Sequence, residues 1–384
     1  LAIGKLGTSF GVEIDDIDVR RLNPDTESGL KAAIGEHRVV VIRNQSLTPT
    51  EQKTFSARLG PLVTLPYIKP LDAHPEIIAV LKEADEFKVS TFGSWWHADF
   101  SYLEAPPIYS ILQAIELPPR GGDTLFADLC TAHDTLSAGM QRLLAPLQVM
   151  HSGAVYGTRA VADGAYGRAR GVVIARGDPA ADFERAHPLV RIHGPTGQRA
   201  LFVNPTYTTR IAGMTVDESR PMLEFLYAHM TAPALTLRQR WRHGDLLIWD
   251  NRAVVHLAVN DYDGHRRLLH RIDFKAGTIE LDGKNYPLKD HKFPTIDPAA
   301  PYELSVEEKK CMERLKASFL RSQKLWDHVR AIVEQGSMYL KRDDHLIFHG
   351  CVPIDENGDF LLMDVDGQPR GGKALFDAIE EVVV

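Results

Sequence analysis

The chain has 384 residues, of which 44 are Lys or Arg and 51 are Asp or Glu, for a formal net charge of -7. An apolar fraction of 44% is enough for a large core and excludes disorder throughout, and the acidic balance argues against a nucleic-acid binder, which needs a basic face. Residues 276–384 hold 14 basic and 20 acidic side chains (net -6), so residues 1–275 are nearly neutral (net -1). The chain therefore divides into two regions of different character.

In residues 1–275, short β-branched runs alternate with polar turns. The run His37–Ile42 predicts a strand, and a capping box with a proline at the first helical position predicts a helix over Thr48–Leu59. A second amphipathic helix is predicted over Thr215–Met230. Six further runs predict strands: Glu76–Leu81, Ile108–Ile115, Thr124–Ala127, Ala200–Val203, Asp245–Trp249 and Leu268–Phe274. Many short strands with few long helices favour a sandwich or barrel.

After residue 275 the pattern of short strands and polar turns ends. Four prolines between residues 287 and 301 predict a linker or extended arm. A helix is predicted over Val306–Gln335, and strands over Met338–Phe348 and Phe360–Val365, around an Asn357-Gly358 turn.

Cysteine content and apolar runs bear on the compartment. Cys130, Cys311 and Cys351 are too few and too scattered for a disulfide framework, which predicts a reducing cytoplasm. No apolar run approaches the roughly 18 residues of a membrane span, so no membrane partner is expected. Homo-oligomers are common among soluble enzymes, and the sequence is compatible with one.

One short motif has metal-ligand chemistry. In a strand, residues i and i+2 share a face, so the imidazole of His97 and the carboxylate of Asp99 would point together and could hold two adjacent positions of one metal ion. The other His-x-Asp triplet, at 243–245, lies in a glycine turn and is interpreted as turn chemistry. A mononuclear iron site of two histidines and one carboxylate needs a third, distant ligand. Eight histidines between residues 151 and 270 offer one, and spacing alone does not choose among them.

Four separated motifs together resemble the taurine dioxygenase and 2,4-dichlorophenoxyacetate dioxygenase family. They are WWHADFSYLEAPP (95–107), GGDTLFADL (121–129), HPLVRIHGPTGQRALFVNPTYTTRI (187–211) and WDNRAVVHLAVNDYDGHRRLLHR (249–271). The resemblance covers about residues 1–275. It implies a mainly β fold with flanking helices around a double-stranded β-helix, which is a jelly-roll, cupin-like core. It also implies an iron(II)- and 2-oxoglutarate-dependent dioxygenase that consumes dioxygen.

The resemblance assigns the iron ligands and the cosubstrate contacts. It makes His97, Asp99 and His256 the iron ligands and therefore the catalytic centre. Thr124 matches the threonine that contacts a 2-oxoglutarate carboxylate, and Arg267 matches the arginine that pairs with the distal carboxylate. A guanidinium binds a planar carboxylate bidentately, so its chemistry agrees with this role.

Two further residues are implied to contact the substrate. Arg271 matches a position near the substrate's anionic group, and Tyr207 matches an aromatic position in the pocket wall. Leu65 stands where the taurine enzyme offers its sulfonate a histidine, so taurine itself is not the expected substrate. We expect a small anionic molecule, such as a sulfonate, an alkyl sulfate or an aryloxy or carboxylic acid, whose hydroxylation yields succinate and carbon dioxide.

Plainer interpretations of the same residues stay open. The basic run 265–271 could be a solvated edge strand, and Thr124 an ordinary β-branched strand residue. Tyr207 could be a core aromatic, and His256 alone could be structural. A non-oxygenase, cupin-like metal protein that binds zinc or manganese remains an alternative, because those ions accept the same ligands.

The C-terminal region resembles part of a different family. GTIELDGKNYPLKDHKFPTIDP, SMYLKRDDHLIFHGCVPIDENGDF and GGKALFDAIEEVV are similar to class III fructose-1,6-bisphosphatases, over about residues 277–384. His349 matches one metal-binding histidine, but the Gly-Asp-x-x-Asp-Arg-Gly and Gly-Asn-His-Asp/Glu motifs are absent from the sequence, which disfavours a metallophosphohydrolase. We therefore predict a fusion of a dioxygenase domain (1–275) with a partial α+β phosphatase-like fragment (276–384). In that fragment His349 is structural and Glu307–Lys310 form a solvated helix face.

Overall fold

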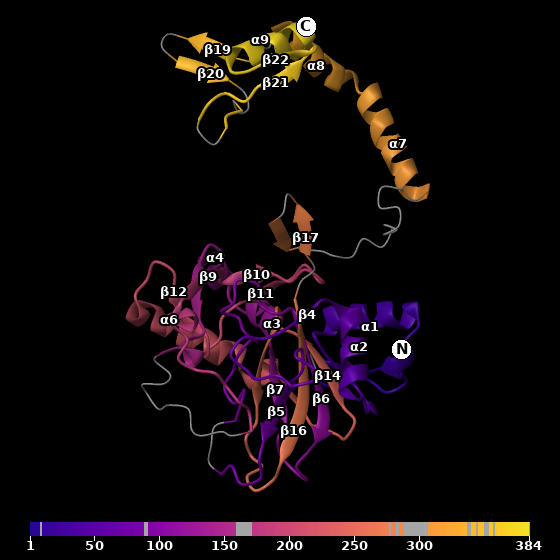
Figure 1. Cartoon of the computed structure of the whole chain (residues 1–384), viewed down its shortest axis with the longest axis vertical. Coiled ribbons are helices and arrows are strands. Elements are labelled where there is room, and N and C mark those ends of the chain that lie inside the picture. The colour runs from indigo at the N-terminus through magenta and orange to yellow at the C-terminus, as the bar shows by residue number, and fades with distance from the viewer. Residues whose placement is uncertain are drawn as a thin grey trace. The chain divides into compact units, whose positions relative to one another are not determined.

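A computed structural model describes residues 1–7, 10–87, 91–158, 171–275, 278–281, 284–287, 304, 306–335, 339–342, 345–348, 353–355 and 358–383. The chain divides into two compact units, Leu1–His291 and Lys292–Val384 (Figure 1). This division falls after the domain boundary predicted at residue 275, which stays a prediction. In the described part of the chain, no helix is both long and apolar enough to cross a membrane.

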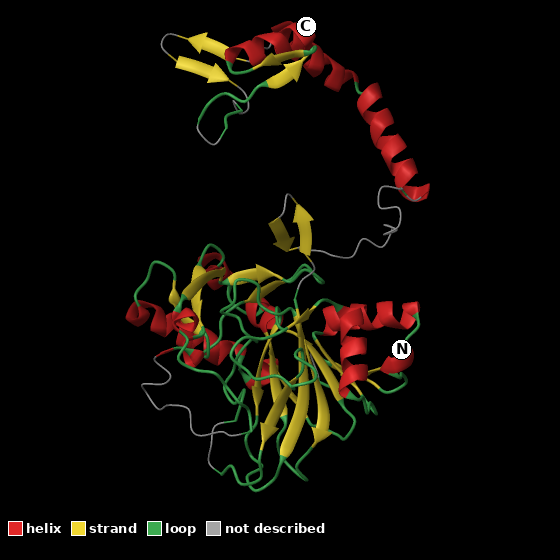
Figure 2. Cartoon of the chain, viewed as in Figure 1, coloured by secondary structure: helices red, strands yellow, loops and turns green. Residues whose placement is uncertain are grey.

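The first unit is built on a large, mostly antiparallel sheet (Figure 2). Its strand order is β1-β2-β3-β14-β6-β16-β4, β5 also pairs with β16, and the β2-β3 pair is parallel. The bounds are β1 Ile3–Lys5, β2 Val12–Ile14, β3 Val39–Ile42, β4 Leu62–Val63, β5 Ile78–Lys82, β6 Tyr109–Glu116, β14 Leu246–Asp250 and β16 Arg267–Phe274.

Three smaller sheets and several helices complete this unit. The sheets have the orders β13-β7-β15, β12-β8-β9 and β10-β11. Their strands are β7 Thr124–Asp128, β8 Gln148–Ser152, β9 Glu184–Pro188, β10 Val190–Ile192, β11 Arg199–Leu201, β12 Thr208–Ile211, β13 Thr236–Gln239 and β15 Val254–Ala258. The helices are α1 Pro24–His37, α2 Pro49–Leu59, α3 Leu129–Asp134, α4 Ala138–Leu144 and α6 Val216–Met230, with 3-10 turns η1 Val19–Arg21, η2 Ala154–Tyr156, η3 Pro179–Asp182 and η4 Pro233–Leu235.

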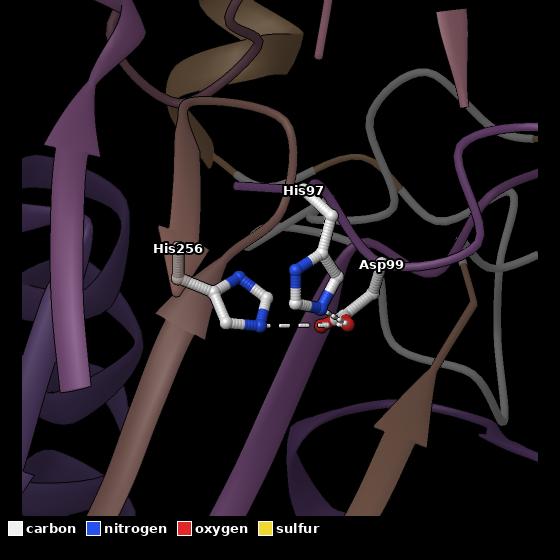
Figure 3. A group of neighbouring side chains, drawn as sticks. All are labelled: His97, Asp99 and His256. Atoms are coloured by element: carbon white, nitrogen blue, oxygen red, sulfur yellow. Dashed lines mark ion pairs between the residues drawn. The ribbon is translucent and has the colours of Figure 1, made fainter. Parts of the chain in front are cut away.

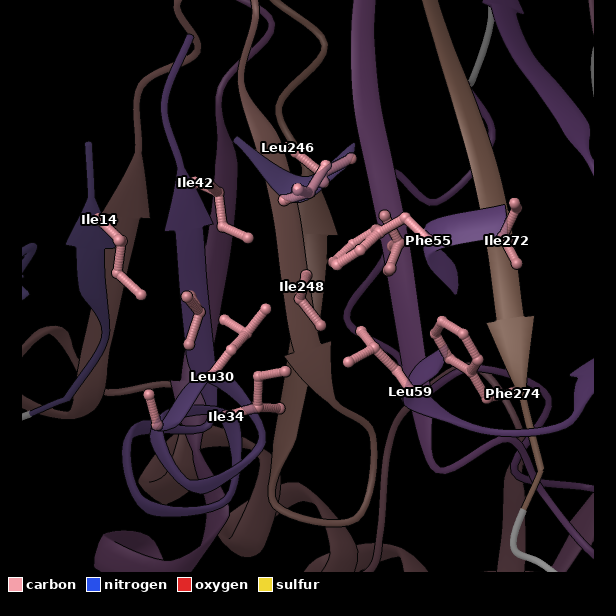
Figure 4. Close-up of a cluster of buried hydrophobic side chains, with 14 of the residues drawn as sticks. Ile14, Leu30, Ile34, Ile42, Phe55, Leu59, Leu246, Ile248, Ile272 and Phe274 are labelled. Atoms are coloured by element: carbon pink, nitrogen blue, oxygen red, sulfur yellow. The ribbon is translucent and has the colours of Figure 1, made fainter. Parts of the chain in front are cut away.

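Strand β3 shows why the large sheet is buried on both faces. Successive side chains of a strand point to opposite faces. Val39 and Val41 pack with Phe126 of the smaller β13-β7-β15 sheet, so they fill the space between the two sheets. Val40 and Ile42 face the other way, into the cluster that helices α1 and α2 cover (Figure 4). Two facing sheets with helices on the outside form the mainly β core that the sequence predicts.

Local sequence signals set the helix boundaries. The predicted capping box at the start of α2 is present, because the Thr48 hydroxyl accepts from the Glu51 N–H and the Glu51 carboxylate accepts from the Thr48 N–H. Helix α6 begins with the same arrangement at Thr215. The prediction for His37 was wrong. It is the last residue of α1, and Arg38 ends that helix in the left-handed conformation (φ 66°) before β3 begins.

The strand and helix predictions downstream of residue 275 need three corrections. The predicted single helix is two helices, α7 Val306–Arg321 and α8 Gln323–Gln335. The first predicted strand is a hairpin of two, β19 Tyr339–Arg342 and β20 His345–Phe348. The last predicted strand begins later, as β21 Met363–Val365, and it pairs with β22 Gln368–Arg370.

The β21-β22 hairpin turns at Asp366-Gly367, where both residues have positive φ (51° and 75°). A tight hairpin turn favours Asp-Gly at such positions as much as Asn-Gly. Met338, His349, Cys351 and Asn357 lie outside the described residues. The chain also has β17 Thr278–Leu281 paired with β18 Lys284–Pro287, and it ends in α9 Lys373–Val383.

Candidate metal and cosubstrate site

Three side chains that could ligate one metal ion converge in the first unit (Figure 3). His256 lies on β15, and His97 pairs with it in an isolated bridge in which each backbone N–H donates to the other residue's carbonyl. The expectation that His97 and Asp99 share a strand was wrong. Beyond the bridge the chain turns, and Phe100 has a φ of 46°, in the left-handed region. The two side chains meet through this turn rather than through strand periodicity.

The ligand atoms have a geometry that fits a metal ion. His97 Nε2 and His256 Nε2 lie 3.5 and 3.6 Å from Asp99 Oδ1, and all three residues are buried. Adjacent ligands that each lie about 2.1 Å from an ion are roughly 3 Å apart, so a small closure would hold one. The Nδ1–H of His97 donates to the Trp95 carbonyl (2.7 Å), which leaves the Nε2 lone pair free for a metal. The donor set of two imidazoles and one carboxylate suits iron(II).

Protonation also fits ligation. Burial first, and then the neighbouring His97, lower the pKa of His256 well below its ordinary value, so this imidazole is neutral. Burial raises the pKa of Asp99, but Arg271, His256 and His97 outweigh it and hold that pKa well below the usual range. A neutral imidazole and an ionised carboxylate are the forms that bind a metal.

A polar network holds the carboxylate of Asp99. The Ser110 hydroxyl donates to Asp99 Oδ2 (2.8 Å) and itself accepts from the Asn251 side-chain amide (2.8 Å). Asn251 in turn accepts from the indole N–H of Trp249 (2.9 Å) and from the Asp99 backbone N–H (3.3 Å). All four residues are buried, so Oδ1 of Asp99, the oxygen that Ser110 does not contact, is oriented toward the histidines.

The remaining oxygen of Asp99 meets Arg271, which the sequence assigned to the substrate. Arg271 Nη2 lies 2.7 Å from Asp99 Oδ1 and also donates to Asp273, so the guanidinium sits between two buried carboxylates. Burial lowers the pKa of Arg271, but Asp273 and Asp99 outweigh it and raise that pKa. Burial raises the pKa of Asp273 above its ordinary value, and the guanidinium, which donates to both of its oxygens, offsets this only in part.

The two residues predicted to bind 2-oxoglutarate share a neighbour. Trp241 donates its indole N–H to the Thr124 hydroxyl (3.0 Å), and its ring lies 5.7 Å from the guanidinium of Arg267. Tyr262 lies 5.8 Å from the same guanidinium. Arg267 is buried, and its Nε has no hydrogen-bond partner among the described residues. A buried guanidinium without a full set of acceptors fits the carboxylate of a dicarboxylic acid.

A glycine lets the chain approach this arginine closely. Gly122 has a φ of 72°, and a Cβ there would lie 3.0 Å from Arg267 Cδ. Because that conformation and that contact both disfavour a side chain, a glycine at position 122 has a local physical reason.

A cavity of about 190 Å³ opens beside His97. Tyr207 lines it, and Arg271 is not among its lining residues. Tyr207 is also part of the core, since its hydroxyl meets that of Tyr156 (3.1 Å) and it is 4% exposed. The other lining residues are Leu81, Lys82, Glu86, Thr91, Phe92, Gly93, Ser94, Trp95, Val155, Tyr156, Val172, Ile174, Arg176, Pro205 and Thr206.

Sequence reasoning missed five residues of this site: Ser110, Trp241, Asn251, Tyr262 and Asp273. Asp273 had a signal, because it shares the alternating face of β16 with Arg267 and Arg271. Asn251 lies inside the motif that contains His256. Tyr262 lies inside the same motif, whereas Ser110 and Trp241 carry no pattern that distinguishes them from core residues. The second His-x-Asp triplet is turn chemistry, since His243 is exposed while Asp245 pairs with Arg43 (2.6 Å).

Residues 2–272 match the family described as "Taurine catabolism dioxygenase TauD, TfdA family". The chain belongs to this family. It is a 2-oxoglutarate-dependent dioxygenase whose cofactor is iron(II) and whose cosubstrates are 2-oxoglutarate and dioxygen. The predicted enzyme class and cofactors are confirmed, and the non-oxygenase alternative is set aside.

Relatives of the TauD, TfdA family cover most of the first unit. The alpha-ketoglutarate-dependent sulfonate dioxygenase of Saccharomyces cerevisiae is 30% identical over 321 residues, which cover 80% of this chain and 73% of that protein. The alkylsulfatase of Acinetobacter baylyi is 31% identical over 299 residues, which cover 76% and 91%.

Solved structures of the family confirm the jelly-roll fold. A taurine dioxygenase from Burkholderia xenovorans has a TM-score of 0.59 at 29% identity and covers 74% of this chain and 94% of that one. AAD-2 in complex with Mn(II) and N-oxalylglycine has a TM-score of 0.59 at 25% identity and covers 71% and 98%.

The C-terminal region matches a second family, as predicted. Residues 258–384 match the family described as "Firmicute fructose-1,6-bisphosphatase", so this match begins inside the TauD, TfdA region. The class 3 fructose-1,6-bisphosphatase of Alkaliphilus metalliredigens is 49% identical over 120 residues, which are 31% of this chain but 18% of that protein. The chain thus spans less than a fifth of the phosphatase relatives that it matches.

Proposed function

We propose that this dioxygenase hydroxylates a small organic anion that carries an apolar chain. The observation that carries the proposal is the convergence of the ligand atoms of His97, Asp99 and His256, of which His97 lines a cavity. In this proposal those three residues hold iron(II), and Thr124 with Arg267 hold 2-oxoglutarate. When bound, the metal and its cosubstrate supply the oxidising chemistry, with release of succinate and carbon dioxide.

The protein's own residues position the reactants and exclude water. Arg267 provides a fixed positive charge on the face of β16 that also carries Arg271, so a dicarboxylic acid anchored there points along that face. The Ser110 and Asn251 network fixes the orientation of Asp99, which keeps one carboxylate oxygen turned toward the two histidines. Buried aromatic rings around the site, including Trp249 and Phe126, keep solvent away from His256.

The cavity supports a substrate larger than taurine. Leu81, Phe92, Val155, Val172 and Ile174 give the cavity a largely apolar wall, which suits an alkyl or aryl chain. Leu65, which stands where the taurine enzyme has a histidine, is buried in the neighbouring aromatic cluster.

The charged residues of the wall are two cations and one acid. The cations are Lys82, which also pairs with Asp263 (2.6 Å), and Arg176, and the acid is Glu86. Relatives named for sulfonates, alkyl sulfates and sulfate esters support an anionic substrate.

A turnover panel tests this proposal. Purified protein with iron(II), ascorbate and 2-oxoglutarate is supplied with taurine, hexanesulfonate, hexyl sulfate or 2,4-dichlorophenoxyacetate, and succinate is measured against a control without substrate. We expect at least one of the last three to release more succinate than taurine does. Protein with Asp99→Ala serves as the metal-site control. If no substrate released succinate above the control, the proposal would be wrong.

A further inference from the structure

The cavity beside His97 has a buried cation in its described wall. Two of the lining residues are positively charged, and they differ in burial: the side chain of Lys82 is 4% exposed, whereas Arg176 is exposed and screened by water. Arg271 does not line the cavity and lies between two buried carboxylates. Of the cations that line the cavity, Lys82 is therefore the one that water screens least.

The ammonium group of Lys82 has three partners among the described residues. Its Nζ donates to Asn260 Oδ1 (2.7 Å) and to Asp263 Oδ1 (2.6 Å), and it lies 4.6 Å from the centre of the Tyr262 ring. Only Asp263 carries a charge, and its side chain is 42% exposed, so water weakens its hold on Lys82. None of the three lines the cavity, so the cavity and these partners lie on different sides of the Lys82 side chain.

Lys82 also lies directly opposite a second buried cation. Strands β5 and β16 pair with Lys82 opposite Arg267, and the Tyr262 ring lies close to both charges, at 4.6 and 5.8 Å. Like charges at opposed positions destabilise a sheet, and a buried charge is costly unless an opposite charge compensates it. In the proposed function 2-oxoglutarate compensates Arg267. Lys82 has only the screened carboxylate of Asp263, and an anion held in the cavity would complete its compensation.

The acid of the cavity wall is directed away from Lys82. Glu86 is buried, and both of its carboxylate oxygens accept from the backbone: Oε2 from the Glu83 N–H (2.6 Å) and Oε1 from the Gly171 N–H (3.3 Å). Among the described residues, the carboxylate that pairs with Lys82 is that of Asp263. Glu86 thus joins two parts of the wall and leaves the charge of Lys82 to other anions.

We propose that Lys82 binds the anionic group of the substrate and thereby determines the preference of this enzyme for anions. The inference rests on the proposed function and deepens it, because it names the residue that recognises the sulfonate, sulfate or carboxylate. Lys82 and His97 line the same cavity, whose wall also contains Val155 and Val172. A substrate held there presents its apolar chain to the metal ligands while its anionic group meets Lys82.

The test replaces Lys82 by Met, which keeps the apolar stem and removes the charge. Protein is loaded with Mn(II) and 2-oxoglutarate under nitrogen, and hexanesulfonate or its uncharged analogue hexyl methyl sulfone is titrated by calorimetry. The unaltered protein should bind the sulfonate at least about tenfold more tightly than the sulfone, because a charge-assisted hydrogen bond forms away from water. Lys82→Met should lose this preference by weakening sulfonate binding, with its affinity for the sulfone unchanged.

Asp263→Asn separates recognition of an anion from a merely structural ion pair. Asn keeps an oxygen that accepts from Lys82 and removes the charge that competes with the substrate. We expect about threefold tighter binding of hexanesulfonate, a modest effect because Asp263 is partly exposed. A structural pair predicts weaker binding for both variants, since each breaks the same contact. Lys53→Met is the matched control, because Lys53 pairs with Glu76 (2.7 Å) and does not line the cavity, and it should change neither affinity.

Three results would overturn the inference. One is an unaltered protein that binds hexanesulfonate no more tightly than the sulfone. Another is a full sulfonate preference in Lys82→Met protein, which would assign the anion to a different cation. The third is weaker sulfonate binding by Asp263→Asn, which remains informative if Lys82→Met does not fold. Failure of the proposed function is distinguishable, because absence of succinate release with every substrate would leave these anaerobic affinities measurable.

Discussion

The two units of the chain use apolar side chains very differently. In the first unit every residue of β3 is buried, because one face meets a second sheet and the other meets α1 and α2. In the second unit α7 has no buried residue, and Met312, Leu315 and Phe319 on it are all at least half exposed. An amphipathic pattern forms a core only where a complementary surface is present.

The largest expected difference between the two units is in the loss of activity when a metal ligand is replaced. We expect Asp99→Ala to reduce 2-oxoglutarate turnover by at least about a thousandfold, because the metal loses its only anionic protein ligand. The anaerobic visible charge-transfer band with iron(II) and 2-oxoglutarate should disappear as well. Glu307→Ala, which removes an exposed carboxylate from α7, should change neither. Retention of the band in Asp99→Ala protein would contradict the ligand assignment.

The next largest effect is on stability. Ile248→Ala empties a fully buried position in the cluster under α1 and α2, so we expect it to lower the free energy of unfolding by about 2–5 kcal/mol. Leu315→Ala, at a side chain that is 50% exposed on α7, should change it by less than about 0.5 kcal/mol. Urea unfolding followed by tryptophan fluorescence measures both. If both variants lost a similar free energy of unfolding, the second unit would also have a well-packed core.

A smaller effect is expected on the KM for 2-oxoglutarate, which should depend on Arg267 but not on its neighbour Arg266. Arg267→Ala should raise the KM for 2-oxoglutarate about a hundredfold, because two charge-assisted hydrogen bonds to a buried carboxylate are lost. Arg266 points to the opposite face and pairs with Glu83 and Glu116, so Arg266→Ala should leave that KM unchanged. The comparison is made by succinate release over a range of 2-oxoglutarate concentrations. An equal rise for both variants would argue for a general effect of the strand.

The smallest expected effect is that of removing the second unit. Chains ending at residue 275 or at residue 291 should keep turnover within about twofold of the full chain, because the described site residues all lie before residue 275. Comparing the two cuts locates the domain boundary, since only the longer one keeps the β17-β18 hairpin. Loss of folding after both cuts would show that the C-terminal unit supports the first.

Much of the fold could be predicted from the sequence, because a short run of β-branched residues rarely forms anything other than a strand. The predicted strands that correspond to β3, β6, β14 and β16 agree with the structure to within a few residues. Both hydrogen bonds of the predicted α2 capping box are present. Helix α1 was missed because its apolar residues are few, so its helical periodicity is weak. The turn at Phe100 was missed as well, because a positive φ at a bulky residue is imposed by its surroundings and has no local signal.

The order of the residues along the chain indicates the kinds of chemistry: two histidines and an aspartate in the order of a known family, an arginine for a dicarboxylic acid, and a second family's fragment after them. Tertiary structure alone decided which groups the charges meet. It brought Asp99 against Arg271, linked Ser110 to both buried carboxylates, and placed Trp241 between Thr124 and Arg267. The physical reason is that a buried charge is governed by the atoms within a few ångströms of it, and distance along the chain does not fix distance in space.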